Sequence, residues 1–243
     1  MQDLPVAVHQ SRLTGKLIDF DAINTDTVSN RFCYDRYRAA KAKNEAAGRV
    51  VDICGICYSY EALDGGYRAR TMRPALKRNT VLAERLLLPN ELPTVLKSFY
   101  RYDAHGELMT EEVNPETGET VRTFGKFTHI SNLCRIAEHN PHCTFALWTK
   151  RTDICKPFFD QHSKPDNLIL IYSNPTIDRI VTRPPKHFDK VFNNVSADKF
   201  TDQQNCTGQK CRDCLACYKF GGTDIIVEAI KKNGRTRKLN SVN

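Results

Sequence analysis

Apolar runs of strand length alternate with helix-like segments along most of the chain. Four runs have the length and side chains of strands, and they cover 95–102, 143–148, 168–172 and 190–193. Helical composition marks five segments, 34–47, 72–88, 128–139, 153–161 and 224–232. Shorter extended pieces are expected over 16–24 and 50–53, and a turn at 114–118 predicts a hairpin within 108–124.

This alternation predicts an α/β fold. The run 168–172 (LILIY) suits a parallel strand that is buried on both faces. Successive βα units form a partial barrel or an open sheet, and in both arrangements sites lie at the carboxyl ends of the strands. We therefore expect a partial (βα) barrel-like or open parallel sheet over 1–200. A cysteine-rich appendage with the last helix would follow over 201–230, and a basic tail over 231–243.

The composition of the 243 residues, 40% hydrophobic and 26% charged, is that of an ordinary globular protein. No apolar run approaches the roughly 20 residues that span a bilayer. The first residues, MQDLP, have neither the basic nor the apolar part of a secretory signal. We expect a soluble, cytoplasmic protein without a membrane partner.

The net charge of +8 is concentrated near the C-terminal end. Five basic residues lie there in a segment without acidic residues, so the rest of the chain is close to neutral. They are Lys231, Lys232, Arg235, Arg237 and Lys238. Such a tail is commonly a solvated terminus, and it could also make weak contacts to nucleic acid through the phosphates.

Ten cysteines carry most of the chemical information. In a reducing cytoplasm, clustered cysteines indicate metal binding or catalysis rather than disulfides. Cys206, Cys211, Cys214 and Cys217 lie in one short loop, and four thiolates from one loop suit zinc or an iron–sulfur cluster. Their gaps of four, two and two residues resemble ferredoxin-type ligation, whereas zinc sites usually pair two distant CxxC knuckles. The spacing favours a cluster, with zinc as the alternative.

Cys54 and Cys57 form a second candidate group together with the earlier Cys33. The CxxC pair alone suits a redox dithiol or half of a metal site. Cys33 precedes the intervening helix and is the candidate third ligand. Three thiolates leave one position of a four-iron cluster open to a small molecule, so this group is the candidate for catalysis.

The three remaining cysteines match no compact ligand set and are expected to be inert core thiols. They are Cys134, Cys143 and Cys155. The sequence contains no P-loop, no dinucleotide-binding glycine motif and no nucleophile elbow. Arg101, Asp103 and Glu107 lie at the end of the predicted strand 95–102, which would place them at its carboxyl mouth.

Five motifs occur together over residues 17–220. They are NRFC at 30–33, ICGICY at 53–58, RYDAHGE at 101–107, FALWTKR at 145–151 and NCTGQKCRDCLACY at 205–218. In this order they resemble the phage gene-product-eighty-eight family, which is found in phages and their hosts. That family is distantly similar to radical S-adenosylmethionine enzymes, whose barrels hold a four-iron (4Fe-4S) cluster on three cysteines near the first strand.

The resemblance implies a role for each motif. Cys33, Cys54 and Cys57 would hold the first cluster, and Gly106 with Glu107 would meet the amino group of S-adenosylmethionine. The four C-terminal cysteines would hold an auxiliary cluster. The radical enzymes usually have gaps of three and two residues between the first three cysteines, whereas a long segment here separates Cys33 from Cys54.

The expected function is thus that of an iron–sulfur protein, a radical S-adenosylmethionine-like enzyme with an unknown substrate and an electron donor as partner. One alternative is a zinc-stabilised phage protein that binds nucleic acid without catalysis. Another is a cluster protein that only senses or transfers electrons.

Overall fold

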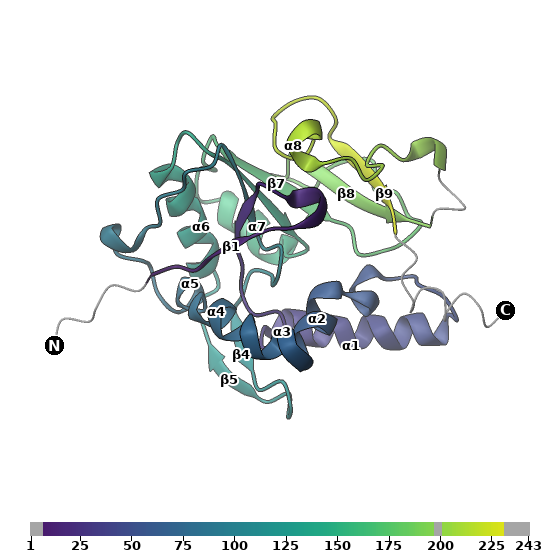
Figure 1. The fold of residues 1–243 in the computed structure, drawn as a ribbon, viewed down its shortest axis with the longest axis horizontal. Helices are drawn as coiled ribbons and strands as arrows, with labels where there is room; N and C mark the ends of the chain where they lie inside the picture. The colour runs from purple at the N-terminus through teal and green to yellow at the C-terminus, as the bar shows by residue number, and fades with distance from the viewer. Residues whose placement is uncertain (1–6, 197–200, 231–243) are drawn as a thin grey trace.

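A single mixed sheet forms the centre of the molecule (Figure 1). The structure is a computed structural model that describes residues 7–196 and 201–230. Within these residues, seven strands lie side by side in the order β1-β2-β3-β6-β7-β8-β9. Their bounds are β1 Gln10–Arg12, β2 Asp21–Ile23, β3 Phe99–Tyr102, β6 Thr144–Thr149, β7 Leu168–Ser173, β8 Lys190–Val195 and β9 Ile225–Ala229.

All neighbouring strands from β2 to β9 are parallel, and only β1 pairs antiparallel, with β2. Each strand of the sheet is followed in space by the next one along the chain, as in a series of βα units. The predicted α/β class with a parallel sheet is confirmed. The hairpin within 108–124 is also present, as a separate pair formed by β4 (Glu111–Val113) and β5 (Thr120–Thr123).

The helices differ widely in length. Their bounds are α1 Arg31–Ala46, α2 Tyr58–Leu63, α3 Gly66–Thr71, α4 Arg73–Arg78, α5 Val81–Glu84, α6 Thr128–His139, α7 Thr152–Phe159 and α8 Cys211–Cys214. Short 3-10 helices cover Gly15–Leu17, Ile53–Ile56, Pro89–Glu91 and Thr201–Gln203. In Figure 1, α1 to α4 lie together along the lower side of the molecule, and α8 lies above β8 and β9 on the opposite side. No helix of the described residues is both long and apolar enough to cross a membrane.

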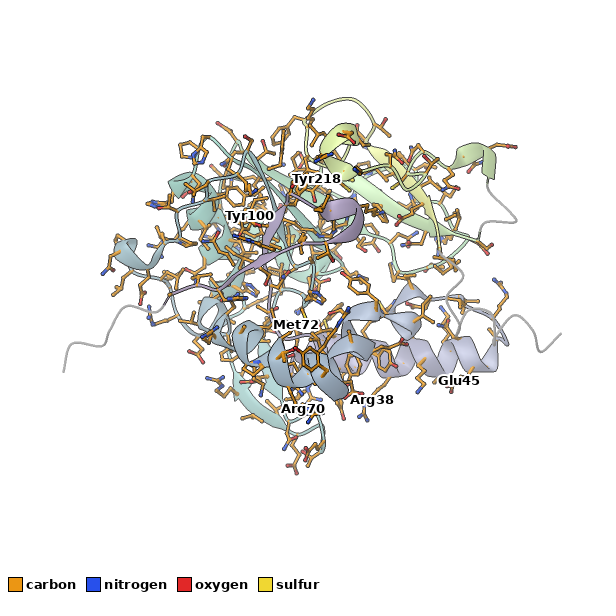
Figure 2. All side chains as sticks on the ribbon, in the orientation of Figure 1. Arg38, Glu45, Arg70, Met72, Tyr100 and Tyr218 are labelled. Carbon is orange, nitrogen blue, oxygen red and sulfur yellow. The ribbon has the colours of Figure 1, made fainter. Side chains whose placement is uncertain are left out.

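The two faces of the sheet pack against different partners. Because side chains alternate along a strand, Phe145 and Leu147 of β6 belong to the main core beneath α6 and α7, together with Tyr100. Trp148, on the other face, packs with Tyr218. Figure 2 shows Tyr100 and Tyr218 among the dense side chains of the sheet. The second face is therefore covered by the cysteine-rich segment rather than by long helices.

The predicted helix over 72–88 is interrupted at Asn79. This side chain is completely buried, and its amide group donates to the carbonyl oxygens of His9 (2.9 Å) and Asn24 (2.7 Å). Its Oδ1 accepts a hydrogen bond from the backbone N–H of His9 at 2.7 Å. The helix is interrupted here because Asn79 binds the N-terminal segment and the residue after β2. As a result, α4 ends at Arg78 and α5 begins at Val81.

The extended piece expected over 50–53 is short: it forms an isolated bridge between Asp52 and Thr176 and leads into a 3-10 helix. Another predicted element is wrong. The predicted helix over 224–232 is instead the strand β9 over Ile225–Ala229, and the described residues end at 230. β9 pairs along its whole length with β8. Because the β-branched residues of this segment fit a strand that has a partner, the pairing makes them a strand rather than a helix.

The cysteine-rich segment is consequently the connection between β8 and β9 rather than an appendage that follows the sheet. Its backbone N–H groups at Asn205 and Cys206 both donate to the carbonyl oxygen of Val227 in β9. The Asn205 side chain adds hydrogen bonds to Ile225 and Val227 of the same strand. The predicted basic tail, 231–243, lies outside the described residues.

Candidate metal and cofactor site

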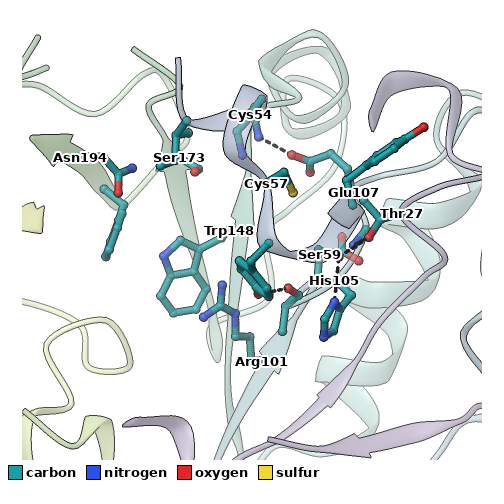
Figure 3. Close-up of a pocket in the computed structure, with 18 of the residues that line it drawn as sticks. Thr27, Cys54, Cys57, Ser59, Arg101, His105, Glu107, Trp148, Ser173 and Asn194 are labelled. Atoms are coloured by element: carbon teal, nitrogen blue, oxygen red, sulfur yellow. Dashed lines mark hydrogen bonds between the residues drawn. The ribbon is translucent and has the colours of Figure 1, made fainter. Parts of the chain in front are cut away.

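A cavity of about 620 Å³ opens at the carboxyl ends of the parallel strands. Five strands contribute side chains to its wall near their ends, and these are Arg101 of β3, Trp148 of β6, Ser173 of β7, Asn194 of β8 and Glu228 of β9 (Figure 3). Ligand sites of parallel α/β sheets lie in this position because the connecting loops converge there. The sequence predicts a site at the carboxyl ends of the strands, and this cavity lies there.

The first cysteine group lines this cavity. Cys33 lies in the first turn of α1, where the Asn30 side chain caps the helix by accepting from the N–H of Phe32 (3.1 Å). Cys54 and Cys57 lie in and just after the 3-10 helix that follows α1. All three line the cavity wall, although a whole helix separates the first from the other two.

Asn44 holds α1 against the 3-10 helix that carries Cys54. Its Oδ1 accepts from the N–H groups of Val51 and Asp52, and its Nδ2 donates to the carbonyl oxygen of Asp52, each at 2.9 Å. At Gly55, a Cβ would lie 2.4 Å from the Asn44 amide nitrogen, so only glycine permits this approach. Asn44 and Gly55 therefore fix the 3-10 helix that carries Cys54 against α1, the helix whose first turn carries Cys33.

Burial raises the pKa of all three thiols, that of Cys54 to about 11, and their mutual repulsion adds to the effect for Cys33 and Cys54. Lys150 acts against this rise at each of them. Burial disfavours the charge of Lys150, but the proximity of Cys54, of the Glu107 carboxylate and of the other two cysteines outweighs it and raises the Lys150 pKa. The site thus places one partly buried lysine beside three thiols whose pKa is raised.

The loop after β3 brings Gly106 and Glu107 to the same wall. Gly106 has φ +91°, and a Cβ there would lie 2.1 Å from Thr25 Oγ1. Its N–H donates to Thr27 Oγ1 at 2.8 Å, which binds this loop to the one after β2. The buried Glu107 carboxylate accepts from the backbone N–H of Lys150 at 2.8 Å (Figure 3). A glutamate is therefore held between the carboxyl ends of β3 and β6.

His105 belongs to a short hydrogen-bonded chain beside this loop. Its Nδ1 lies 2.7 Å from Ser59 Oγ, which in turn lies 2.5 Å from Thr27 Oγ1. Burial, with a further contribution from the charge of Arg101, lowers the pKa of His105 to about 4. The imidazole is therefore neutral at physiological pH and fixes α2 to the loop after β3.

Three members of the second cysteine group, Cys206, Cys211 and Cys217, line the same cavity. Lys16 Nζ lies 3.7 Å from Cys206 Sγ and forms an ion pair with Glu228. Burial raises the pKa of Cys217 to about 12. The structure thus brings cysteines from both ends of the chain to one cavity.

The fourth member of that group behaves differently. Cys214 is exposed and is not among the residues that line the cavity. Its Sγ accepts a hydrogen bond from Gln209 Nε2 at 3.5 Å. Its assignment as a metal ligand stays a prediction, as do those of the other six cysteines.

The predicted core thiols are confirmed. Cys134, Cys143 and Cys155 are buried within the main core beneath α6 and α7. Burial raises the pKa of Cys134 and Cys143 to about 12. These thiols are apolar packing groups in their surroundings.

Sequence reasoning placed Arg101, Asp103 and Glu107 at the mouth of a strand, and all three line the cavity. It missed Lys150 and Lys16. The first directly follows the apolar strand β6, so the same rule of strand ends could have found it. The second lies near the N-terminus with no pattern around it, and only its contact with Glu228 reveals it.

Within residues 7–196 and 201–230, no three His, Cys, Asp or Glu side chains are gathered into a site for a metal ion. The donor set of the first group, three partly buried thiols beside a cation, fits an iron–sulfur cluster in its chemistry, because such clusters take thiolate ligands. Comparison of the chain with models of protein families, with curated proteins and with solved structures found no match.

Proposed function

We propose that this chain is an iron–sulfur protein that acts as a radical S-adenosylmethionine-like enzyme. The observation that carries the proposal is the cavity at the carboxyl ends of sequentially ordered parallel strands, whose wall includes two separate cysteine groups. It agrees with the resemblance to the phage gene-product-eighty-eight family, which rests on the sequence motifs.

In this proposal Cys33, Cys54 and Cys57 hold the first cluster. When bound, such a cluster supplies an electron, received from an external donor, to S-adenosylmethionine at its open iron. The three thiols release their protons on binding, and Lys150 balances part of the negative charge that results. Glu107 offers a buried carboxylate to the amino group of the bound methionine, and Gly106 keeps its loop close to Thr25.

The second group has an auxiliary or structural role in the proposal. Cys206, Cys211 and Cys217 line the cavity, so a cluster held there would border the same space as the first one. Lys16, which lies beside Cys206 and pairs with Glu228, would balance part of the negative charge of this second cluster. The substrate would bind between the two groups.

Metal content tests the proposal most directly. Protein purified without oxygen should contain iron and acid-labile sulfide and absorb near ~400 nm. The double variant C54A/C57A should lose one cluster, C211A/C217A the other, and the buried-core variant C134A neither. Stoichiometric zinc without iron would favour the zinc-stabilised alternative, and loss of all iron in both double variants would mean one shared site.

Turnover separates an enzyme from an electron carrier. With S-adenosylmethionine and a low-potential reductant, the wild-type protein should release deoxyadenosine, and C54A/C57A should not. Glu107→Gln should lower the rate and weaken binding of S-adenosylmethionine while it leaves the iron content unchanged. A reduced, iron-loaded protein that releases no deoxyadenosine would reduce the proposal to electron transfer or sensing.

A further inference from the structure

Arg101 stands out among the cavity residues by the way its guanidinium is held. The guanidinium lies over the indole ring of Trp148, 4.1 Å from the ring centroid (Figure 3). Among the described residues it forms no ion pair, and its Nε is buried without a hydrogen-bond partner. A partly buried cation loses hydration, and a facing anion would offset this loss further than the contact with the ring does.

The other basic side chains of the wall already face carboxylates. Lys16 pairs with Glu228, and Arg36 Nη2 lies 2.7 Å from a carboxylate oxygen of the buried Asp52. The lysine beside the first cysteine group lies near a buried glutamate. Arg101 is thus a cation of this wall that forms no ion pair among the described residues, although its charge also acts on Asp103 and Tyr218.

The nearest acidic residue along the chain does not satisfy Arg101. Asp103 is buried and lines the cavity, yet the described residues contain no ion pair between the two. Its Oδ2 is itself buried without a hydrogen-bond partner within this part of the chain. Its backbone has φ +54°, in the left-handed region, which aspartate enters more readily than most other residues with a side chain. Within the described residues the wall thus presents a guanidinium without an ion pair and a carboxyl oxygen without a hydrogen-bond partner.

The surroundings of Arg101 place it on the side of the second cysteine group. Its stacking partner Trp148 contacts Tyr218, with ring centroids 5.5 Å apart, and Tyr218 follows Cys217 directly in the chain. The cofactor residues proposed above, Gly106 and Glu107, are held by Thr27 and by the backbone N–H of Lys150, neither of which contacts Cys217 or Tyr218 in the hydrogen bonds described. Trp148, Leu17 and the aromatic ring of Phe192 give this side of the cavity an apolar wall.

We propose that Arg101 binds an anionic group of the substrate, a carboxylate or a phosphate, joined to an apolar body that packs beside Trp148. The planar guanidinium offers two parallel N–H donors, which match two oxygens of either group. A hydroxyl or amide N–H next to the anion would donate to Asp103. The inference rests on the proposed function only in taking this cavity as the substrate site.

Trp148 provides the readout, because it is the only tryptophan of the chain. The full chain, purified without oxygen, is titrated with inorganic phosphate and with acetate at constant ionic strength, against a chloride control. Tryptophan fluorescence and calorimetry should both show saturable binding of at least one of these anions. Arg101→Gln should weaken it at least tenfold, and Arg101→Lys, which keeps the charge without the planar fork, should lie between.

Arg38→Gln is the matched control, because Arg38 also lies over an aromatic ring, that of Tyr34 at 4.0 Å, but is not part of the cavity wall. It should bind the anions like the wild type. Equal binding by the wild type and Arg101→Gln, or no saturable binding by the wild type, would overturn the inference.

Iron content and binding of S-adenosylmethionine are measured on the same preparations. Loss of iron in Arg101→Gln would mean that Arg101 balances the charge of the thiolates, and loss of S-adenosylmethionine binding would mean that it holds the cofactor's carboxylate. Either result would count against a substrate site. Anion binding that depends on Arg101 in a protein without iron would leave the inference standing while the proposed function fails.

Discussion

A few single residues, which other residue types could not replace without a clash or lost hydrogen bonds, hold the loops of the cavity in place. Gly55 and Gly106 both occupy positions where a Cβ would collide with a neighbouring segment, and at Gly106 the backbone is also left-handed. Asn44 satisfies three backbone groups with one side chain. These residues carry no chemistry, yet they determine where the cysteines and Glu107 lie.

Replacing Gly106 with alanine tests the close approach of the two loops. The new Cβ would meet Thr25 Oγ1, so we expect Gly106→Ala to lower the free energy of unfolding by about 2 kcal/mol. Gly208→Ala is the control, since Gly208 has the same φ of +91° but open space around it. Urea unfolding measures both, and equal losses would mean that backbone conformation rather than the collision dominates.

His129 makes stability depend on pH. Its Nδ1 accepts from the N–H of Met109 at 2.9 Å, and burial lowers its pKa to about 3. Below the ordinary pKa of about 6.5, His129 is protonated in the unfolded chain but stays neutral in the folded chain. The free energy of unfolding therefore decreases as the pH falls from 6.5 towards 3. At pH 5 the loss from one such histidine is about 2 kcal/mol.

Urea unfolding at pH 7 and pH 5 measures this loss. His129→Asn can still accept the hydrogen bond from Met109 but does not titrate, so its stability should change less between the two pH values. His105, whose pKa is also lowered, leaves part of the dependence in the variant. An identical pH dependence in both proteins would contradict the assignment to His129.

At the scale of the element, packing partners outweigh local propensity in several places. The apolar periodicity of 128–139 predicts a helix, and α6 has those bounds. The pattern of 224–232 predicts a helix as well, yet Ile225, Ile226 and Val227 form a strand because β8 offers them an edge. Short segments of this kind cannot be assigned from their own residues, since the deciding partner lies elsewhere in the chain.

Asn79 illustrates the same point for a helix that breaks. Asn79→Ala removes three hydrogen bonds from a buried position and leaves the backbone groups of His9 and Asn24 unsatisfied. We expect a loss of unfolding free energy on the order of 3 kcal/mol. Asn90→Ala, an exposed asparagine, should cost far less. Similar losses at both positions would mean that the buried hydrogen bonds contribute little.

At the scale of the molecule, the sequence predicts the location of the site and some, but not all, of the residues that form its wall. The rule of strand ends found Arg101, Asp103 and Glu107, and the cysteine motifs named the thiols of the wall. Lys16 could not be found, because its neighbours Cys206 and Glu228 lie about 200 positions away and no local pattern encodes such a contact.

The proposed clusters should stabilise the whole fold. Metal that binds the folded chain and not the unfolded one raises stability with its affinity, and it must displace protons from thiols whose pKa is raised. We expect a higher Tm for iron-loaded protein than for protein stripped by a chelator, with a smaller difference in C54A/C57A. Calorimetric scans under anaerobic conditions measure this, and equal Tm values would contradict it.

The ion pair between Lys16 and Glu228 joins the beginning of the described chain to its last strand. During synthesis on a ribosome, the N-terminal cysteines emerge long before β9, which supplies one side of the enclosure. Until that strand docks, the early thiols face solvent and oxidants. A nascent chain that stalls before residue 225 would therefore expose them unprotected, and rapid completion of the last strand becomes part of keeping them reduced.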